Sequence, residues 1–305
     1  MAKAMYLGID FLVTPHLMPF VVEVNVGLPG GAQEYELTHR VYHGQSSGIF
    51  EKIERTSREV YGRPFHDYLH SLPFIESLKP FKIWMDGMGP FPSTFHPGLR
   101  LEDKWIQYQL IHSIIAMPET MIFDPFHLRE AEKFLERKGA IVLKRRLGRG
   151  GKGLQRITDS QGLMNVEPRD CLLQEYVEST VDGFNFSIRS VAFGGRFMCM
   201  YANLSTRPAS NHGTLVFVSP DNSFGLAKKD FRTESFNQKS WEAKIWFGDN
   251  APPYLRHNLY EDVVAQTTLH LPGSALDSIR ETSIRIERLY EALDLSVLPQ
   301  ACFEE

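Results

Sequence analysis

The sequence is poor in the features that mark several classes of protein. It has only three cysteines, Cys171, Cys199 and Cys302, and their wide spacing argues against a disulfide framework or a zinc knuckle. No apolar run approaches the roughly 20 residues of a membrane-spanning helix. Asp10 interrupts the first apolar stretch, which is too short for a signal peptide. We therefore expect reduced thiols, a cytoplasmic location and no membrane partner.

Positive charge is not in excess either. The chain has 33 Lys and Arg against 37 Asp and Glu, which gives a formal net charge of -4 at pH 7. Proteins that bind nucleic acid usually carry a basic face, so we expect no nucleic-acid partner. The composition, 43% hydrophobic and 23% charged over 305 residues, is typical of a globular protein with one large domain or two ordinary ones.

Strand and helix patterns are intermixed along the chain, which indicates an α+β or α/β fold. Strands are predicted at 5–13, 19–26, 140–144, 153–157, 171–177, 185–193 and 196–204. Helices are predicted at 48–61, from Asp103 to about Ile115, from Asp124 to Gly139, and at 278–293. The inward faces of these helices are expected to include Ile53, Val60, Ile106, Ile114, Ala131 and Phe134.

Oxygen-bearing side chains interrupt the first two predicted strands. Asp10 lies on the first strand, and Glu23 and Asn25 follow on the second. Residues two apart on a strand share a face, so Glu23 and Asn25 point the same way while Val22 and Val24 point into the core. Carboxylate and amide oxygens are ligands for Mg²⁺, and we predict a magnesium site here. The alternative is an edge strand with solvated polar residues on one side.

A basic, glycine-rich segment, KRRLGRGGKG, occupies residues 144–153. Its glycines let backbone N–H groups approach phosphate oxygens, and Lys144, Arg149 and Lys152 neutralise charge, which suits a polyphosphate. The segment matches G-x-G-x-x-G, but a strand pattern follows it and not the helix that a dinucleotide site requires. It is not a P-loop, because Gly153 follows Lys152. An ordinary basic hairpin turn is the alternative.

The stretch CLLQEYV at 171–177 predicts a buried strand. Backbone groups from Glu175 to Val177 could pair with the edge of an adenine base. An apolar strand that ends in a glutamate is also common in proteins without a nucleotide.

Taken together and in order, the motifs of this chain resemble those of ATP-grasp enzymes. They are DKWIQYQLIHSIIAMPET, IVLKRRLGRGGKG, LLQEYVESTVDG, IRSVAFGG and STRPASNHG, with GIDFL, PFVVEVN and PGG at the front of the chain. The resemblance spans about two-thirds of the sequence. It implies an α+β fold in which two subdomains grip ATP between antiparallel sheets.

The resemblance implies roles for individual residues. Those expected to bind the nucleotide are Lys104, Lys144, Gly150, Gly151, Lys152, Glu175, Tyr176 and Val177, with Asp182 or Asn185 at the ribose. Those expected at the reaction centre are Arg189, Arg207 and Asn211, and two Mg²⁺ ions, with Mn²⁺ as the alternative, would be held by Asp10, Glu23 and Asn25. Two departures are visible: Asn185 is not an acid, and Pro29 comes four residues after Asn25 where the family usually has three.

The order of the motifs is unusual, because the metal-binding motif normally closes the family's sequence. Here it opens the chain, which implies a circular permutation in which the helix 278–293 would lead into the strand 5–13. The implied divisions are a metal-binding part of the C-terminal subdomain at 1–61, a linker or truncated subdomain at 62–100, an N-terminal subdomain with a glycine-rich lid at 101–178, and the rest of the C-terminal subdomain at 179–305.

The resemblance also implies an activity. The expected enzyme is an ATP- and Mg-dependent carboxylate–amine ligase that acts through an acylphosphate, on an amino acid, a peptide or another small carboxylate. A phosphotransferase on the same fold and a non-catalytic nucleotide-binding protein are the alternatives. The expected partners are small-molecule carboxylate and amine substrates, and a homodimer is left open. Asp10, Glu23 and Asn25 should face Lys144 and Arg189 across one cleft.

Overall fold

The chain divides into two units, which are described one at a time. Unit 1 consists of Met1–Leu72 and Glu178–Leu293, and unit 2 of Pro73–Val177 and Asp294–Glu305. The structure, a computed structural model, describes residues 5–26, 29–72, 74–85, 87, 89–93, 95–148, 153–164, 170–205, 213–220, 225–226, 233–235 and 263–304. Each unit combines helices with a largely antiparallel sheet, so the predicted α+β class is confirmed.

Unit 1 is built on one large sheet. Its strands are β1 (Leu7–Val13), β2 (Pro19–Asn25), β7 (Thr180–Val181), β8 (Phe184–Phe193), β9 (Arg196–Ser205), β10 (Gly213–Pro220), β11 (Gly225–Leu226), β12 (Thr233–Ser235) and β13 (Val263–Leu271). The order across the sheet is β11-β13-β10-β9-β8-β1-β2, with β12 beside β13 and β7 beside β8. Only β10 and β13 pair in parallel among these described strands. The hairpin predicted at the front of the chain is confirmed, and it joins the sheet through β8.

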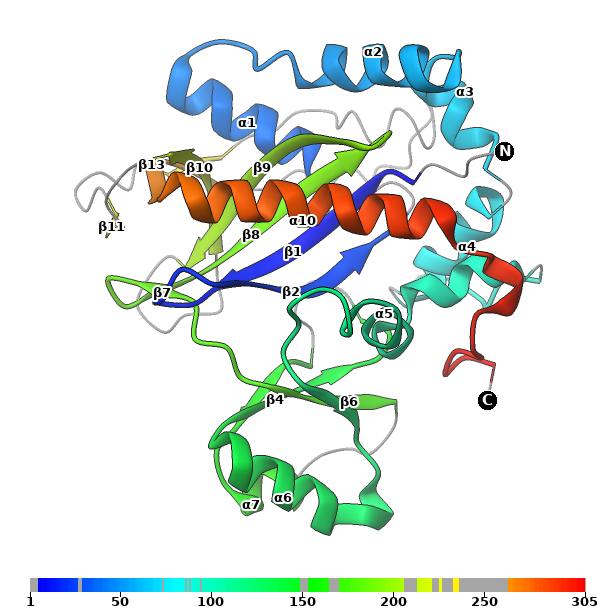
Figure 1. Cartoon of the computed structure of the whole chain (residues 1–305), viewed down its shortest axis with the longest axis vertical. Helices are drawn as coiled ribbons and strands as arrows, with labels where there is room; N and C mark the ends of the chain where they lie inside the picture. The colour runs from blue at the N-terminus through cyan, green and yellow to red at the C-terminus, as the bar shows by residue number, and fades with distance from the viewer. Residues whose placement is uncertain are drawn as a thin grey trace. The chain divides into compact units, whose positions relative to one another are not determined.

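Helices lie on both faces of this sheet. They are α1 (Ala32–His43), α2 (Ile49–Tyr61), α3 (Phe65–His70) and α10 (Gly273–Ala292). Helix α10 crosses in front of β8 and β1 in Figure 1, and the hydroxyls of Ser283 and Ser190 meet at 2.5 Å. The start of α1 packs against Val191, the neighbour of Ser190, which points to the opposite face. A sheet covered on both faces buries its central strands, and five of the seven residues of β1 are buried, whereas Asp10 and Leu12 are half-buried.

Helix α2 agrees with its predicted limits, 48–61, to within one residue. Ile53 is fully buried, as predicted. The prediction that Val60 points inward is wrong, because it lies at the helix end beside Gly194 and is 42% exposed.

Unit 2 has a smaller sheet with the strand order β3-β6-β4-β5. Its strands are β3 (Thr120–Ile122), β4 (Ile141–Arg145), β5 (Gln155–Ile157) and β6 (Cys171–Glu175). Its helices are α4 (Ile75–Met85), α5 (Lys104–Ile111), α6 (Leu128–Lys138) and α7 (Ser160–Met164), with short 3₁₀ helices η1 (Pro97–Glu102), η2 (Pro125–His127) and η4 (Leu295–Val297). Ala131 and Phe134 of α6 pack into the core against Ile141, as predicted.

Two further expectations need correction or refinement. Helix α5 ends at Ile111, earlier than the predicted Ile115, so Ile114 is not on a helix face and is 40% exposed. Residues 62–100, in which the sequence shows weak periodicity, contain α3, α4 and most of η1. Pro80 lies inside α4. A proline removes one backbone hydrogen bond from a helix, so this segment is hard to predict as helical from its sequence.

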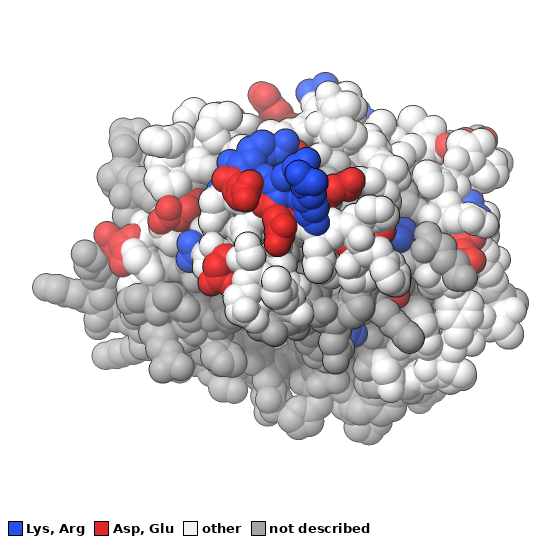
Figure 2. Space-filling view, turned by 90° about the horizontal axis from the view of Figure 1, so that it is seen from below, with Lys and Arg blue, Asp and Glu red and all other residues white. Residues whose placement is uncertain are grey.

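Charges of both signs lie together at the lower end of the molecule. Figure 2 views this end and shows a group of Lys and Arg side chains with Asp and Glu side chains beside it. In unit 2, Arg137 and Lys138 of α6 both form ion pairs with Glu119. Among the described residues, no helix combines the length and apolar composition that crossing a bilayer requires.

Candidate functional site

Four of the sequence-predicted site residues meet on neighbouring strands of unit 1. Asp10 of β1 lies opposite Glu23 of β2 on one side and opposite Arg189 of β8 on the other. The guanidinium of Arg189 holds Asp10 with two hydrogen bonds, Nε to Oδ1 at 2.7 Å and Nη2 to Oδ2 at 2.5 Å. The amide of Asn25 donates to Asp10 Oδ2 at 3.3 Å. Strand register therefore brings two chain segments that are 179 residues apart into one polar group.

An irregularity in the β1–β2 pairing shapes this group. Asp10 pairs with Glu23, but the next residue, Phe11, pairs with Val21, so the register shifts by one residue and the extra residue on β2 is Val22. Such bulges turn side chains and occur often beside active sites. The prediction that both Val22 and Val24 are core residues is wrong for Val22, which is only half-buried. The bulge moves the second core position of β2 to Val21.

The start of α1 closes over Arg189. Arg189 Nη1 donates to the Gly30 carbonyl at 3.4 Å, and the Gly31 N–H donates to Glu34 Oε2 at 2.6 Å. Gly31 has φ 153°, and a Cβ there would lie only 2.5 Å from Cγ2 of Val191. Glycine is therefore required by both conformation and space. Glu34 is a site residue that the sequence analysis missed, and its signal was a glutamate three residues after a helix cap.

The charges of this group favour a bound cation. Burial alone would lower the pKa of Arg189, but Asp10 above all, then Tyr201 and Glu23, raise that pKa well above its usual value. Burial raises the pKa of Glu34, and its backbone hydrogen bonds and Arg189 offset this only in part. Burial thus favours the neutral form of Glu34, but Asp10 and Glu23 still place two carboxylates beside one guanidinium. An excess of negative charge attracts cations.

The donor types also fit a divalent cation. Asp10, Glu23 and Asn25 supply the hard oxygens that Mg²⁺ prefers. Asp10 Oδ2 accepts hydrogen bonds from both Arg189 and Asn25, whereas Oδ1 accepts one from Arg189 and keeps a second lone pair for a cation. Within the described parts of the chain, His, Cys, Asp and Glu form no metal-binding group of three or more. The candidate set comprises two acids and one amide, so it depends on Asn25 as the third ligand.

In unit 2 the two predicted phosphate-binding lysines lie on α5 and β4. Lys104 is the first residue of α5 and is only 8% exposed, and its ammonium donates to the Gly148 carbonyl at 2.7 Å. Lys144 lies on β4 opposite Leu172 of β6. The described residues thus place Lys104 at the base of the glycine-rich loop.

The predicted adenine edge follows the end of β6, also in unit 2. Glu175 accepts hydrogen bonds from Lys138 Nζ at 3.0 Å and from the Glu119 N–H at 3.3 Å. The Tyr176 N–H donates to the Ala140 carbonyl at 3.1 Å. The Glu175 N–H likewise donates to the Glu119 carbonyl at 2.8 Å. Both N–H groups are therefore used within the unit, and a base that needs a donor from this edge would depend on the N–H of Val177.

The remaining predicted residues fall into two groups. Asp182 lies in the turn between β7 and β8 with a left-handed φ of 51°, and Asn185 pairs with Thr180 on these strands. Gly150, Gly151, Lys152, Arg207 and Asn211 lie outside the described residues. Asp10, Glu23 and Asn25 were expected to face Lys144 and Arg189 across one cleft. Arg189 lies beside Asp10 on the adjacent strand. Lys144 belongs to the other unit, so its place opposite the three candidate ligands stays a prediction.

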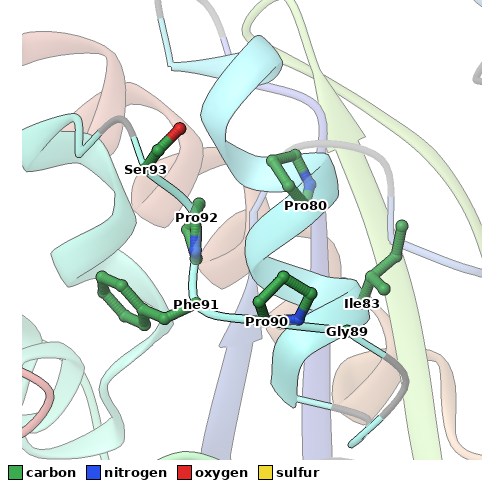
Figure 3. A pocket seen from close by; sticks show the side chains of 7 residues that line it. All are labelled: Pro80, Ile83, Gly89, Pro90, Phe91, Pro92 and Ser93. Carbon is green, nitrogen blue, oxygen red and sulfur yellow. The ribbon is translucent and has the colours of Figure 1, made fainter.

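A separate apolar pocket of about 330 Å³ lies in unit 2 (Figure 3). Its lining residues are Pro80, Ile83, Gly89, Pro90, Phe91, Pro92 and Ser93. Among the lining residues that the structure describes, none has a titratable side chain and none is a predicted site residue. These described residues offer apolar packing surface.

No family model matches the chain, and no curated protein matches it either. The case for a function therefore depends on the geometry of the residues themselves.

Proposed function

We propose that the chain is an ATP- and Mg-dependent carboxylate–amine ligase with a circularly permuted ATP-grasp fold. The observation that carries the proposal is the group formed by Asp10, Glu23, Asn25 and Arg189 on three neighbouring strands. Its spacing is that of the family's metal motif, and its charge and donor types suit Mg²⁺.

The architecture of the two units supports the fold. Unit 1 places the candidate metal ligands on a largely antiparallel sheet, and unit 2 is a second α+β unit with an antiparallel sheet. The basic, glycine-rich segment joins β4 to β5 of that smaller sheet. A hairpin connection of this kind suits a lid that excludes water from a reactive intermediate.

The permutation is supported by contacts within unit 1. Leu7, at the start of β1, pairs with Ala192 at the end of β8. The turn that follows β8 binds the last part of α10, because the Gly195 N–H donates to Glu287 Oε2 at 2.8 Å. The end of α10 and the start of β1 therefore both lie near this turn, and the unpermuted order needs only a short connection between them.

The proposed chemistry asks the chain for positioning and charge neutralisation and not for a nucleophile. The substrate carboxylate attacks the γ-phosphorus of ATP and displaces ADP to give an acylphosphate, and the amine then attacks the acyl carbon and displaces phosphate. Asp10, Glu23 and Asn25 would hold Mg²⁺, which would neutralise part of the phosphate charge. Arg189, held in place by both oxygens of Asp10, stabilises negative charge that develops during transfer.

Two measurements on the full chain test the proposal. Isothermal titration should show binding of Mg-ATP and much weaker binding of ATP with EDTA. Hydroxylamine should trap the acylphosphate as a hydroxamate when amino acids, peptides and other small carboxylates are supplied with ATP. ADP release with an acceptor but no hydroxamate would assign the chain as a phosphotransferase. Absence of Mg-ATP binding would overturn both enzymatic functions and favour a non-catalytic role.

A further inference from the structure

Residues 294–304, which follow α10 and belong to unit 2, are tied to η1 by one arginine. Arg100 makes a two-pronged ion pair with Glu304, Nε to Oε1 at 2.7 Å and Nη2 to Oε2 at 2.8 Å. Its third nitrogen, Nη1, donates to the Leu298 carbonyl at 2.7 Å. Both side chains of the ion pair are only 16% exposed. This pairing uses the geometry in which arginine binds a carboxylate most firmly.

Apolar contacts hold the same segment. The ring of Phe303 lies 4.8 Å from Phe81 and 5.7 Å from Phe95, centre to centre. Leu298 and Ala301 are buried. The segment is therefore part of the folded unit and does not merely follow α10.

The segment shares an acceptor with the base of the glycine-rich loop. Asp103 is fully buried and accepts hydrogen bonds from the N–H groups of Cys302 at 3.0 Å and Trp105 at 2.9 Å. The same carboxylate binds Arg146, with Nη2 to Oδ2 at 2.7 Å and Nε to Oδ2 at 3.0 Å. One buried acid thus joins the segment, the start of α5 and the residue that follows β4.

Each predicted phosphate-binding lysine lies near one member of the Asp103–Arg146 ion pair in the chain. Lys104 follows Asp103 directly, and its N–H donates to the Arg146 carbonyl at 3.1 Å. Arg146 comes two residues after Lys144, and its own N–H donates to the Asp170 carbonyl at 2.7 Å. Movement of Arg146 would therefore shift Lys104 and the first residues of the loop together.

We propose that the segment 294–304 positions the phosphate-binding lysines through Asp103, so that its docking sets the affinity for Mg-ATP. This inference rests on the proposed function. Asp103 is a positioning residue here, because it acts through Lys104 and Arg146 and not on the nucleotide. Undocking of the segment removes one hydrogen bond from Asp103 and frees Arg146 and Lys104 to move.

The substitution Glu304→Ala tests the coupling, since it breaks the ion pair with Arg100 and leaves Asp103 and Arg146 intact. Hydrogen–deuterium exchange should be about 10-fold faster at the amides of Cys302, Lys104 and Arg146. The Kd for Mg-ATP should rise about 10-fold, within the usual range for coupled sites. The matched control, Glu130→Ala, removes an exposed acid of α6 in the same unit and should change neither quantity.

Rescue separates positioning from a loss of folding. Arg100→Lys keeps the charge opposite Glu304 but loses the two-pronged geometry, so its effects should be intermediate. Faster exchange confined to residues 294–304, with Lys104 and Arg146 unchanged, overturns the inference while the proposed function stands. If the unmodified chain binds no Mg-ATP, the proposed function fails, and exchange at Lys104 and Arg146 alone upholds or overturns the positioning role.

Discussion

The two units hold their candidate residues by different means. In unit 1, Arg189 is paired with Asp10, side chain to side chain, on adjacent strands whose register is set by the sheet. In unit 2, the ammonium of Lys104 donates to the backbone carbonyl of Gly148. The preceding residue in the chain, Asp103, is fully buried and fixes the start of the helix that carries Lys104. The pairing of strands fixes the geometry of a site that lies on a sheet. A site beside a loop depends instead on buried polar side chains that hold the loop in place.

The comparison implies that unit 2 is the more sensitive to loss of one anchor. Asp103→Ala should lower the free energy of unfolding by about 3–5 kcal/mol, because it leaves the buried guanidinium of Arg146 unpaired. Urea unfolding measures this. The control Asp277→Ala breaks an exposed ion pair with Arg280 and should change stability by no more than about 0.5 kcal/mol. A loss below about 1 kcal/mol at Asp103 would contradict its role as an anchor.

A substitution in the candidate metal group of unit 1 should reduce enzymatic activity more than it reduces the stability of the fold. Asp10→Asn should lower ATP-dependent turnover about 100-fold, since Arg189 and the metal ligands lose their shared carboxylate. Steady-state kinetics measures the effect. Asp67→Asn, which alters an exposed acid of α3 beside His66, is the control and should retain full turnover. Equal turnover of the Asp10→Asn and Asp67→Asn variants would contradict the proposal that the candidate metal group of unit 1 takes part in the reaction.

A glycine provides a sharper test of how tightly α1 closes over Arg189. Gly31→Ala should lower the free energy of unfolding by about 2 kcal/mol, because the new Cβ meets Val191 and the backbone is in a region that favours glycine. The matched change Gly273→Ala places a Cβ in open space at the start of α10 and should be neutral or slightly stabilising. Thermal unfolding of both variants gives the difference.

The smallest expected effect concerns pH and lies away from both candidate sites. Burial raises the pKa of Glu287 to about 7 from 4.5, Glu291 adds to the rise, and the bonds from Gly195 and Gly194 and the charge of Arg288 oppose it. The folded state therefore binds the proton more tightly than the unfolded state. This contribution to stability is complete below about pH 4.5 and is lost as pH rises through about 7.

The variant Glu287→Gln should remove that dependence. Above pH 7 it should be about 1–2 kcal/mol more stable than the natural chain, and the difference should vanish near pH 4.5. Urea unfolding at pH 5 and pH 8 measures it. Glu281→Gln on the exposed face of α10 should leave the pH dependence unchanged. A natural chain that is more stable at pH 8 than at pH 5 would contradict the sign.

Much of the local structure could be predicted because its causes are local. Asp103 caps α5, and the strands that carry Asp10 and Glu23 follow from alternation of apolar side chains. The half-buried position of Val22 could not be predicted, because a bulge depends on how two strands pair and not on the alternation within one. The exposure of Ile114 depends on where α5 ends, and no strong stop signal precedes it.

The sequence by itself determined the residue types and spacing of the candidate metal group, since Asp10, Glu23 and Asn25 lie in one hairpin. Only the tertiary structure decided that Arg189 would bind Asp10, because the register of β1 against β8 joins residues far apart in the chain. The same holds for Asp103. Its role as the cap of α5 could be predicted from the sequence, but its hydrogen bond from the Cys302 N–H could not. Propensity acts over a few neighbouring residues, whereas burial and register are settled by the whole folded chain.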